Sequence, residues 1–261
     1  MDFDTVKLHI LDSSAHIILN RPDRRNAFNR GMIGDLTRAF RRLVDHSCRS
    51  IVLTGEGPAF SAGADLEYMH EIKVAGEEEN LADAHRLSDL LELIYTHPKP
   101  VIARVNGPAV GGGVGLVAAC DIAVAVRGAF FAFSEVRLGL VPAVIGPYVV
   151  RKIGESAARR YMLTGERFNA EEAQRIGLVH HVAVQGDLDQ VVHGIATAVS
   201  LGGPEALAAC KELIHRSGEE PLQDVSEWTT RLITRLREGE EGQEGMESFL
   251  EKRDPRWQTG R

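Results

Sequence analysis

Residues 101–120 read VIARVNGPAVGGGVGLVAAC and set the pattern for the fold. The run VIARV is short and rich in β-branched residues, which is typical of a buried strand. After NGPAV, four glycines lead into LVAAC, which is apolar on every side and favours a buried helix. Glycines at a helix start let another group approach the backbone closely, and the first free N–H groups there carry partial positive charge. We therefore expect this start to bind an anion, either a phosphate or an oxyanion.

Two other interpretations of the glycine cluster remain open. Residues 113–118 match the pattern GxGxxA, and Glu135 lies twenty residues after Gly115, which is the arrangement of a dinucleotide site. Such a motif leaves its strand directly, whereas five residues intervene here, and the next strand ends without an acidic residue for the ribose. In the other alternative, the glycines serve only to let the helix pack closely.

Alternating strands and helices extend outward from this stretch. Runs of β-branched or aromatic residues predict strands at 6–10, 17–19, 51–53, 101–103, 122–124 and 131–133. Apolar residues at helical spacing lie between them, as in 33–44 and 81–94. Beyond residue 142 the β pattern nearly stops, and signals typical of a helix end or start take over at 154–156, 164–166, 169–171 and 203–205. We therefore predict an α/β layer structure with a mostly helical last third, folded as one unit.

The final segment, roughly residues 221–253, carries an apolar face on otherwise charged helices. Its members are Leu222, Val225, Trp228, Leu232, Ile233, Leu236, Met246, Phe249 and Leu250. This face either covers the core of its own chain or docks on a neighbouring subunit, and amphipathicity alone does not decide between the two.

Composition excludes several classes of function. The 261 residues are 44% hydrophobic and 26% charged, so the chain can bury a core without metal or disulfides. A net charge of −7 gives no positive field for nucleic acid. Three widely spaced cysteines predict neither a disulfide framework nor a metal site and favour a reducing, cytoplasmic setting. We expect no membrane span and no leader, since no apolar stretch approaches about 18 residues and the opening MDFDT is acidic.

A second loop and one acidic residue carry candidate chemistry. Residues 55–66, GEGPAFSAGADL, also follow a strand, so an N–H from this loop and one from the glycine cluster could grip one developing oxyanion. Ser61 lacks the GxSxG spacing of a nucleophile, and Asp65 is interpreted first as the cap of the following helix. Glu135 ends the aromatic run FFAFSE, where desolvation would raise its pKa toward neutrality, as suits a proton-transfer group. The alternative is a surface pair with Arg137.

The remaining polar candidates are weaker. His180 and His181 lack a third ligand at metal spacing, so we expect no metal site. We expect His97 to be exposed to solvent. Arg24 and Arg25 either contact a phosphate or form a solvated basic turn.

Together these motifs resemble the crotonase (enoyl-CoA hydratase/isomerase) superfamily, in its order and at its usual spacing over nearly the whole chain. The resemblance rests on NRP at 20–22 with NA at 26–27, SAGAD at 61–65, GPAVGGG at 107–113, CDI at 120–122, SE at 134–135 with LG at 138–139, LTG at 163–165, AEEA at 170–173 and FLEKR at 249–253. It implies a spiral of ββα turns with a CoA-thioester site in residues 1–200. Residues 201–261 are then a helical region for oligomerisation and site closure, in a homotrimer or a dimer of trimers.

The resemblance also implies roles for individual residues. The N–H groups of Ala64 and Gly112 would form an oxyanion hole for the thioester carbonyl, and Glu135 would be the catalytic acid/base. The implied CoA contacts are Arg24, Arg25, Ala27, Ala62, Ala64, Asp65 and Leu66, with Phe249 and Lys252 reaching CoA from an adjacent subunit. No cofactor is implied, because CoA is part of the substrate.

One position departs from the family pattern. Hydratases of this family that use two carboxylates carry a second Glu in the helix after the glycine-rich loop, and the matching residue here is Gly115. A lone carboxylate must take a proton from water and return one to Cα during hydration, whereas double-bond isomerisation requires only moving a proton between carbons. Residues 112–117, 134–143 and 157–161 nevertheless resemble bacterial methylglutaconyl-CoA and isohexenylglutaconyl-CoA hydratases of leucine and acyclic-terpene degradation, some of which have glycine there.

We therefore predict a hydratase acting on a branched, dicarboxylic 2-enoyl-CoA, with Arg137 or Lys152 holding the second carboxylate. A Δ3,Δ2-enoyl-CoA isomerase is the alternative enzyme. A catalytically idle CoA-binding scaffold is the alternative from a different class.

Overall fold

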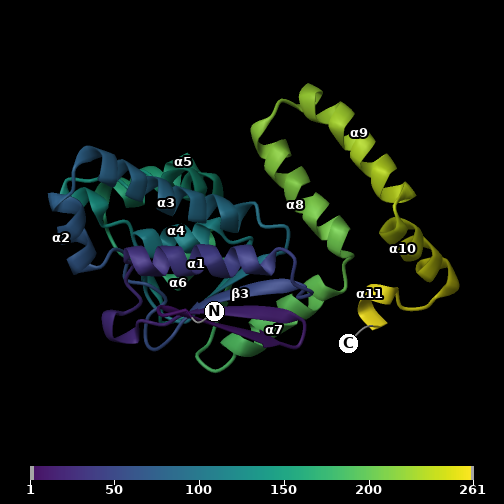
Figure 1. The fold of residues 1–261 in the computed structure, drawn as a ribbon, viewed down its shortest axis with the longest axis horizontal. Coiled ribbons are helices and arrows are strands. Elements are labelled where there is room, and N and C mark those ends of the chain that lie inside the picture. The colour runs from purple at the N-terminus through teal and green to yellow at the C-terminus, as the bar shows by residue number, and fades with distance from the viewer. Residues whose placement is uncertain (1–2, 260–261) are drawn as a thin grey trace.

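A six-stranded sheet lies at the centre of the computed structural model, which describes residues 3–259 (Figure 1). Met1 and Asp2, which contributed to the expectation of no leader, lie outside the described residues. In spatial order the strands are β1 (Val6–Leu11), β2 (Ser14–Leu19), β3 (Ser50–Gly55), β4 (Val101–Val105), β6 (Ile122–Val126) and β9 (His181–Ala183). The first pair is antiparallel and each later pair is parallel.

A three-stranded sheet lies next to the glycine cluster. It contains β5 (Ala109–Val110), β7 (Phe130–Ala132) and β8 (Phe168–Asn169), with β5 parallel to β7 and β7 antiparallel to β8. All six predicted strands are confirmed. The sequence did not predict β5, β8 and β9, because two or three residues are too few to establish a strand pattern.

The helices before residue 201 surround the central sheet. They are η1 (Pro22–Arg24), α1 (Arg30–Leu43), α2 (Leu66–Val74), α3 (Glu77–Tyr95), α4 (Gly112–Ala119), η2 (Glu135–Leu138), α5 (Gly146–Thr164), α6 (Ala170–Arg175) and α7 (Leu188–Ser200). Helix α1 packs on β1 and β2, α4 on β4, and α7 on β3, β4 and β6. Figure 1 shows α7 on the other side of the sheet from α1 and α4, and β3 is accordingly buried along its whole length.

Helix boundaries follow the signals read from the sequence. Gly154 has φ 74 and kinks α5, and Gly165 ends α5 in the left-handed conformation. The side chain of Asn169 accepts a hydrogen bond from Glu172 N–H and caps α6. Gly203 precedes Pro204 at the start of α8. The predicted helix ends and starts in the last third are therefore confirmed.

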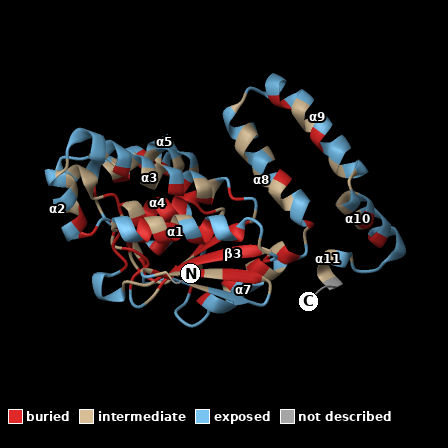
Figure 2. Cartoon of the chain, viewed as in Figure 1, coloured by how far each residue is buried: buried red, intermediate tan, exposed pale blue. Residues whose placement is uncertain are grey.

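The core is formed by the central sheet and the buried faces of the helices around it. Helix α4 is buried from Gly113 to Ala119, as the all-apolar sequence predicts, and Figure 2 shows this burial in red along α4 and β3. Helix α1 buries one face that includes Met32, Leu36 and Phe40. Each such fully buried apolar side chain contributes roughly 1.5–3 kcal/mol to folding.

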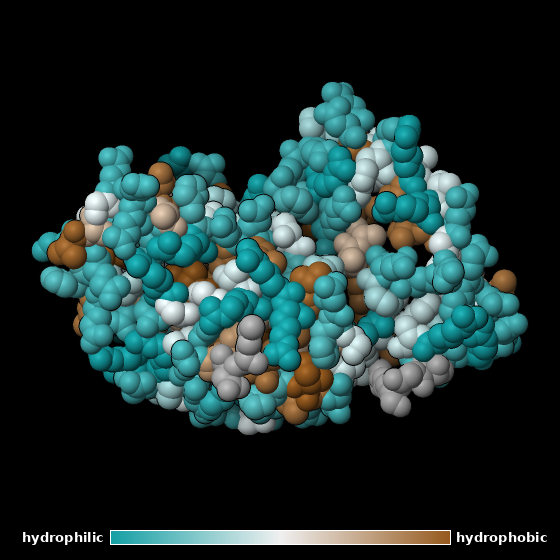
Figure 3. All heavy atoms as spheres, viewed as in Figure 1, coloured by the Kyte–Doolittle hydropathy of each residue, from teal (hydrophilic) through white to brown (hydrophobic). Residues whose placement is uncertain are grey.

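The last four helices form an arm beside the sheet-containing part (Figure 1). They are α8 (Pro204–Glu219), α9 (Leu222–Glu238), α10 (Glu240–Glu251) and α11 (Arg256–Thr259). Figure 3 shows a hollow in the outline between this arm and the sheet-containing part. Lys211 of α8 joins the arm to the core through an ion pair with Asp121, whose atoms Nζ and Oδ2 lie 2.7 Å apart.

The apolar face of the arm is only partly covered within one chain. Val225 and Leu232 are buried, but Leu222, Phe249 and Leu250 are 86%, 83% and 79% exposed. Val225 and Leu232 lie on α9, which packs against α8 and α10, and they are not part of the main hydrophobic core. Docking of the exposed members on a neighbouring subunit stays a prediction. None of the helices within residues 3–259 has the length and apolar character needed to cross a bilayer.

The expectation that His97 is exposed was wrong. Its side chain is 1% exposed, because the loop after α3 turns it under α1. There Nε2 lies 3.2 Å from Phe40 O, and Nδ1 accepts a hydrogen bond from Lys99 N–H. Burial lowers the pKa of His97 to about 4.

Candidate active site

The loop that contains Ala64 is held by two short parallel bridges. On one side, Phe28 N–H donates to Gly63 O at 2.6 Å and Asp65 N–H donates to Phe28 O at 2.8 Å. On the other side, Val110 N–H donates to Ser61 O at 2.9 Å. Phe28 hydrogen-bonds to Gly63 and Asp65, the residues before and after Ala64. Because successive N–H groups of an extended segment point to opposite sides, the N–H of Ala64 is directed away from Phe28. It has no acceptor within residues 3–259, and Ala64 is exposed.

The glycine cluster supplies a second free donor. Gly111 has φ 52 and ψ −122, a backbone conformation that a residue with a Cβ rarely adopts, and its N–H donates to Ala132 O. This sharp turn makes Gly112 the first residue of α4, whose N–H has no intrahelical partner. Gly112 is half-buried, and its N–H finds no acceptor in the described part of the chain.

The two loops meet as expected. Ser61 pairs with Ala109 in a parallel bridge, and a Cβ on Gly113 would lie 2.7 Å from Ser61 O. The free N–H groups of Ala64 and Gly112 therefore belong to two segments in direct contact. Such a pair of fixed donors can stabilise negative charge on one oxygen.

Glu135 lies beside the glycine turn as the first residue of η2. A Cβ on Gly111 would stand 3.0 Å from Glu135 Oε1, so glycine at 111 allows the carboxylate to approach the backbone. Glu135 Oε2 is buried and makes no hydrogen bond in the described structure. Desolvation raises the pKa of Glu135, as the aromatic run predicts. The alternative of a surface pair with Arg137 was wrong, because Arg137 reaches Thr164 O instead, at 3.5 Å.

Close packing accounts for the two glycines inside α4. A Cβ on Gly113 would collide with Ser61, and a Cβ on Gly115 would lie 2.8 Å from Ile145 Cβ and nearer still to Ile145 Cγ2. Ile145 is 3% exposed. At Gly113 and Gly115 the glycines therefore serve close helix packing, as in the second alternative from the sequence. This packing leaves no room for the pyrophosphate of a dinucleotide. The volume in which a second Glu would begin is filled by Ile145.

The two loops that carry predicted CoA contacts, around Arg24 and around Ala62, lie against each other. Arg24 and Arg25 are exposed, and Arg24 Nη2 lies 3.0 Å from Glu67 Oε1 of α2. Ala62 N–H donates to Arg25 O at 3.0 Å, which joins the two loops directly. Ala27 is buried, and Leu66 is 79% exposed.

Asp65 caps α2, as predicted, by accepting from Glu67 N–H. It also makes an ion pair that sequence reasoning missed, with Arg21 Nη2 2.8 Å from Asp65 Oδ2. Burial would raise the pKa of Asp65, but the hydrogen bonds from Glu67 N–H and Arg21 and the charge of Arg21 outweigh it, so the net pKa is lowered. Arg21 Nη1 also donates to Ala27 O at 2.7 Å, which links the pair to the first loop.

Asn26 is a second structural residue that the sequence did not single out for a role. It is fully buried with φ 54. Its Oδ1 accepts from Arg21 N–H at 2.9 Å, and its Nδ2 donates to Ala59 O at 2.9 Å. In the sequence, the short motifs NRP at 20–22 and NA at 26–27, which contain Arg21 and Asn26, were the only indication of this structural role.

Three predicted residues do not reach this site within one chain. Phe249 lies on α10 and Lys252 is the cap that ends it, and Figure 1 shows α10 at the opposite end of the molecule from α2. Lys152 was predicted as one possible anchor for a distal carboxylate. Its Nζ donates to Cys120 O, at the far end of α4 from Gly112, so this placement was wrong. Lys152 lies on the first part of α5 and its partner Cys120 follows the last residue of α4, whereas Gly112 is the first residue of α4, so the length of α4 separates Lys152 from the oxyanion donors.

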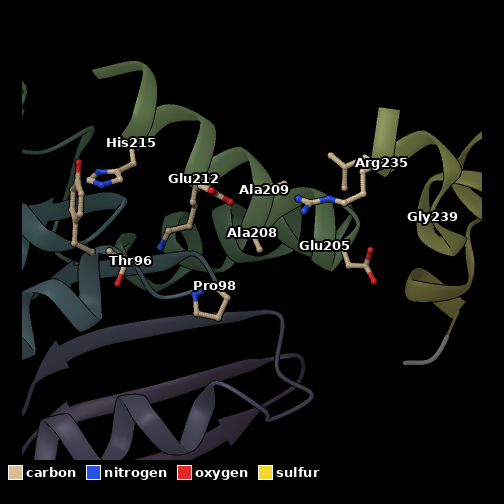
Figure 4. A pocket seen from close by; sticks show the side chains of 12 residues that line it. Thr96, Pro98, Glu205, Ala208, Ala209, Glu212, His215, Arg235 and Gly239 are labelled. Atoms are coloured by element: carbon tan, nitrogen blue, oxygen red, sulfur yellow. The ribbon is translucent and has the colours of Figure 1, made fainter. Parts of the chain in front are cut away.

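A cavity of about 570 Å³ lies elsewhere, between the end of α3 and helices α8 and α9 (Figure 4). Thr96 and Pro98 line it from the core, and Glu205, His215 and Arg235 from the arm. It contains none of the predicted site residues. Within residues 3–259, no three His, Cys, Asp or Glu side chains gather in a way that could hold a metal ion.

Comparison with known proteins agrees with this geometry. The sequence profile described as enoyl-CoA hydratase/isomerase matches residues 10–260. The chain belongs to the enoyl-CoA hydratase/isomerase family. A Thermus thermophilus protein named as an enoyl-CoA hydratase is 38% identical over 93% of this chain and 96% of its own length.

Solved structures of the family share the whole fold. The crystal structure of an enoyl-CoA hydratase from Shewanella pealeana has a TM-score of 0.94 and 38% identity, covering 98% of this chain and 96% of that one. Pseudomonas aeruginosa AtuE has a TM-score of 0.94 and 36% identity, covering 97% and 99%. The predicted α/β crotonase fold and enzymatic nature of the chain are confirmed.

Proposed function

We propose that this enzyme adds water across the 2,3 double bond of a branched, dicarboxylic enoyl-CoA of the 3-methylglutaconyl type. The observation that carries the proposal is the position of Glu135. Its Oε2 atom is buried without a hydrogen-bond partner within residues 3–259, and its Oε1 atom lies against the turn that frees the Gly112 N–H. An acid/base next to an oxyanion site is the arrangement that chemistry beside a thioester carbonyl requires.

Each group has one task in this reaction. The thioester oxygen accepts hydrogen bonds from the N–H groups of Ala64 and Gly112, which stabilise the negative charge that develops there as water attacks Cβ. Glu135 takes a proton from the attacking water while the oxygen of that water bonds to Cβ. The protonated Glu135 then gives a proton to Cα. Desolvation by burial raises the pKa of Glu135, which makes its carboxylate a stronger base toward water than an ordinary glutamate. No cofactor is required.

Arg137 supports a substrate with a second carboxylate. It lies two residues after Glu135 and is exposed, and within residues 3–259 its side chain donates to Thr164 O and pairs with no carboxylate. A guanidinium suits a planar carboxylate because it can donate two parallel hydrogen bonds. Reversing the charge with Arg137→Glu should raise KM for a glutaconyl thioester at least about 10-fold and leave KM for neutral crotonyl-CoA within about 2-fold. An unchanged KM for the glutaconyl thioester removes the dicarboxylic assignment.

A Δ3,Δ2-enoyl-CoA isomerase is the second candidate, favoured by the observation that Ile145 fills the space beside Gly115. A single carboxylate is sufficient to move a proton between two carbons. The experiment is turnover of 3-methylglutaconyl-CoA and of a 3-enoyl-CoA, side by side, with wild type and Glu135→Gln. Glu135-dependent hydration supports the proposal, whereas turnover of the 3-enoyl thioester alone supports the isomerase. Thioester binding without any turnover supports an idle scaffold.

We further propose a cytoplasmic homotrimer or dimer of trimers, in which Phe249 and Lys252 contact CoA bound to a neighbouring subunit. The exposed Phe249 and Leu250 on α10 support this assembly, because covering large apolar side chains with a partner subunit stabilises the complex. Lys252→Glu should raise KM for CoA thioesters and leave KM for pantetheine thioesters, which lack the nucleotide phosphates, unchanged. Equal effects on both thioesters remove the predicted CoA contact of Lys252.

A further inference from the structure

Phe28 contacts both segments that carry the proposed oxyanion donors. Its backbone brackets Ala64, because Phe28 N–H donates to Gly63 O at 2.6 Å and Phe28 O accepts from Asp65 N–H at 2.8 Å. Its ring lies against Gly112. A Cβ on Gly112 would stand 2.7 Å from Phe28 Cε2 and 3.0 Å from Cδ2, so the ring packs directly on the glycine backbone. One residue therefore spans the two donors.

The position of Phe28 is itself fixed by its surroundings. Asn26, two residues earlier, is buried and hydrogen-bonded to the backbone of the second loop at Ala59. Asn29, the next residue, caps α1 by accepting from Met32 N–H at 2.9 Å. Phe28 is 2% exposed and so has almost no surface with which to meet a ligand. Any effect it has on the reaction must pass through Ala64 and Gly112.

Spacing is the property that an oxyanion hole depends on. Two N–H groups share one oxygen only if both lie about 2.7–3.1 Å from it. The ring of Phe28 acts as a rigid spacer, since it has two side-chain torsions and is packed on all sides. A shorter or more flexible side chain would let Gly112 move toward the Ala64 loop, and a misplacement of about 1 Å can cost about 100-fold in rate.

We propose that Phe28 is a positioning residue that sets the spacing of the Ala64 and Gly112 donors. This inference rests on the proposed function, in which those donors bind the thioester oxygen. It predicts a particular split of effects. Loss of the ring lowers kcat and weakens polarisation of the bound carbonyl, while KM changes little, because Phe28 itself does not touch the substrate.

The experiment compares Phe28→Leu and the unbranched, more flexible Phe28→Met with Phe40→Leu. Phe40 is a matched control, because it is a fully buried phenylalanine on α1 that packs against His97, away from the two loops. We measure kcat, KM, the unfolding midpoint, and the infrared carbonyl band of an enoyl-CoA labelled with ¹³C at the thioester carbon. Binding to an oxyanion hole lowers the frequency of this band.

We expect each Phe28 variant that folds to show kcat reduced about 10-fold or more, a smaller shift of the carbonyl band on binding, and KM within about 3-fold of wild type. Phe40→Leu should keep the wild-type kcat and band shift while losing stability. A folded Phe28 variant with the wild-type band shift and kcat overturns this inference alone. A wild-type enzyme that does not shift the band overturns the proposed oxyanion role and this inference with it.

Discussion

Ile145 stands in the space that a side chain at Gly115 would need. A Cβ on Gly115 would lie 2.8 Å from Ile145 Cβ, a separation that real Cβ atoms do not show. The glycine at 115 and the isoleucine at 145 are thus one structural feature, in which α4 and the residue before α5 pack directly together.

Gly115→Glu should therefore lower the free energy of unfolding by about 3 kcal/mol, because it adds both overpacking and a charge to a buried site. Adding Ile145→Ala to Gly115→Glu should recover part of this loss, so that the double variant is at least about 1 kcal/mol more stable than the sum of the single changes. Chemical denaturation of all three variants measures this coupling. Gly128→Glu is the matched control, because a Cβ there meets nothing within 4 Å, and it should show no coupling to Ile145→Ala. Additive effects at 115 and 145 would contradict the packing relationship.

Glu135→Gln should lower kcat at least about 100-fold, because the amide cannot exchange a proton with water or Cα. In the wild type, kcat/KM should fall as pH decreases through the raised pKa of Glu135, since the reaction begins with its carboxylate form. The pH profile of kcat/KM and the stability of both proteins are measured together.

The same pKa shift has a stability consequence of opposite sign. A carboxyl whose folded pKa is raised favours folding in its protonated form, so this contribution is present below the unfolded pKa and is lost as pH rises through the folded pKa. Glu135→Gln should therefore be more stable than wild type at neutral pH and lose that advantage toward pH 4. Equal stability of the two proteins across this range would argue that Glu135 is well solvated.

Sequence patterns predicted the parts of this molecule that depend on neighbours in the chain. The long β-branched runs gave six strands, the GGG run gave a buried helix start, and the aromatic run before Glu135 gave its raised pKa. Local sequence patterns did not predict contacts between residues that are far apart in the chain. The pairing of Arg21 with Asp65 and the packing of Ile145 on Gly115 depend on how loops meet in the fold. The wrong expectations for His97 and Lys152 arose for the same reason.

Arg21→Met should destabilise the fold by about 3 kcal/mol, because it leaves the carboxylate of Asp65, which is 3% exposed, without its cation. Thermal or chemical unfolding measures the loss. Asp65→Asn should cost less, since an asparagine is neutral and remains able to cap α2. Arg24→Met is the control, because its ion pair with Glu67 is exposed on both sides and should contribute under about 1 kcal/mol. A smaller loss from Arg21→Met than from Arg24→Met would contradict this assignment.

His97 should make the fold sensitive to acid. Burial lowers its pKa to about 4 in the folded state, whereas an unfolded histidine titrates near pH 6.5. Between these values the unfolded chain binds a proton that the folded chain does not, so this site lowers the free energy of unfolding progressively as pH falls from about 6.5 to 4, by about 3 kcal/mol in total. His97→Gln removes the titrating group, and its unfolding free energy should fall less than that of wild type over the same range. His85→Gln, a change at an exposed histidine of α3, should follow the wild type. Parallel pH curves for wild type and His97→Gln would show that the buried ring does not resist protonation.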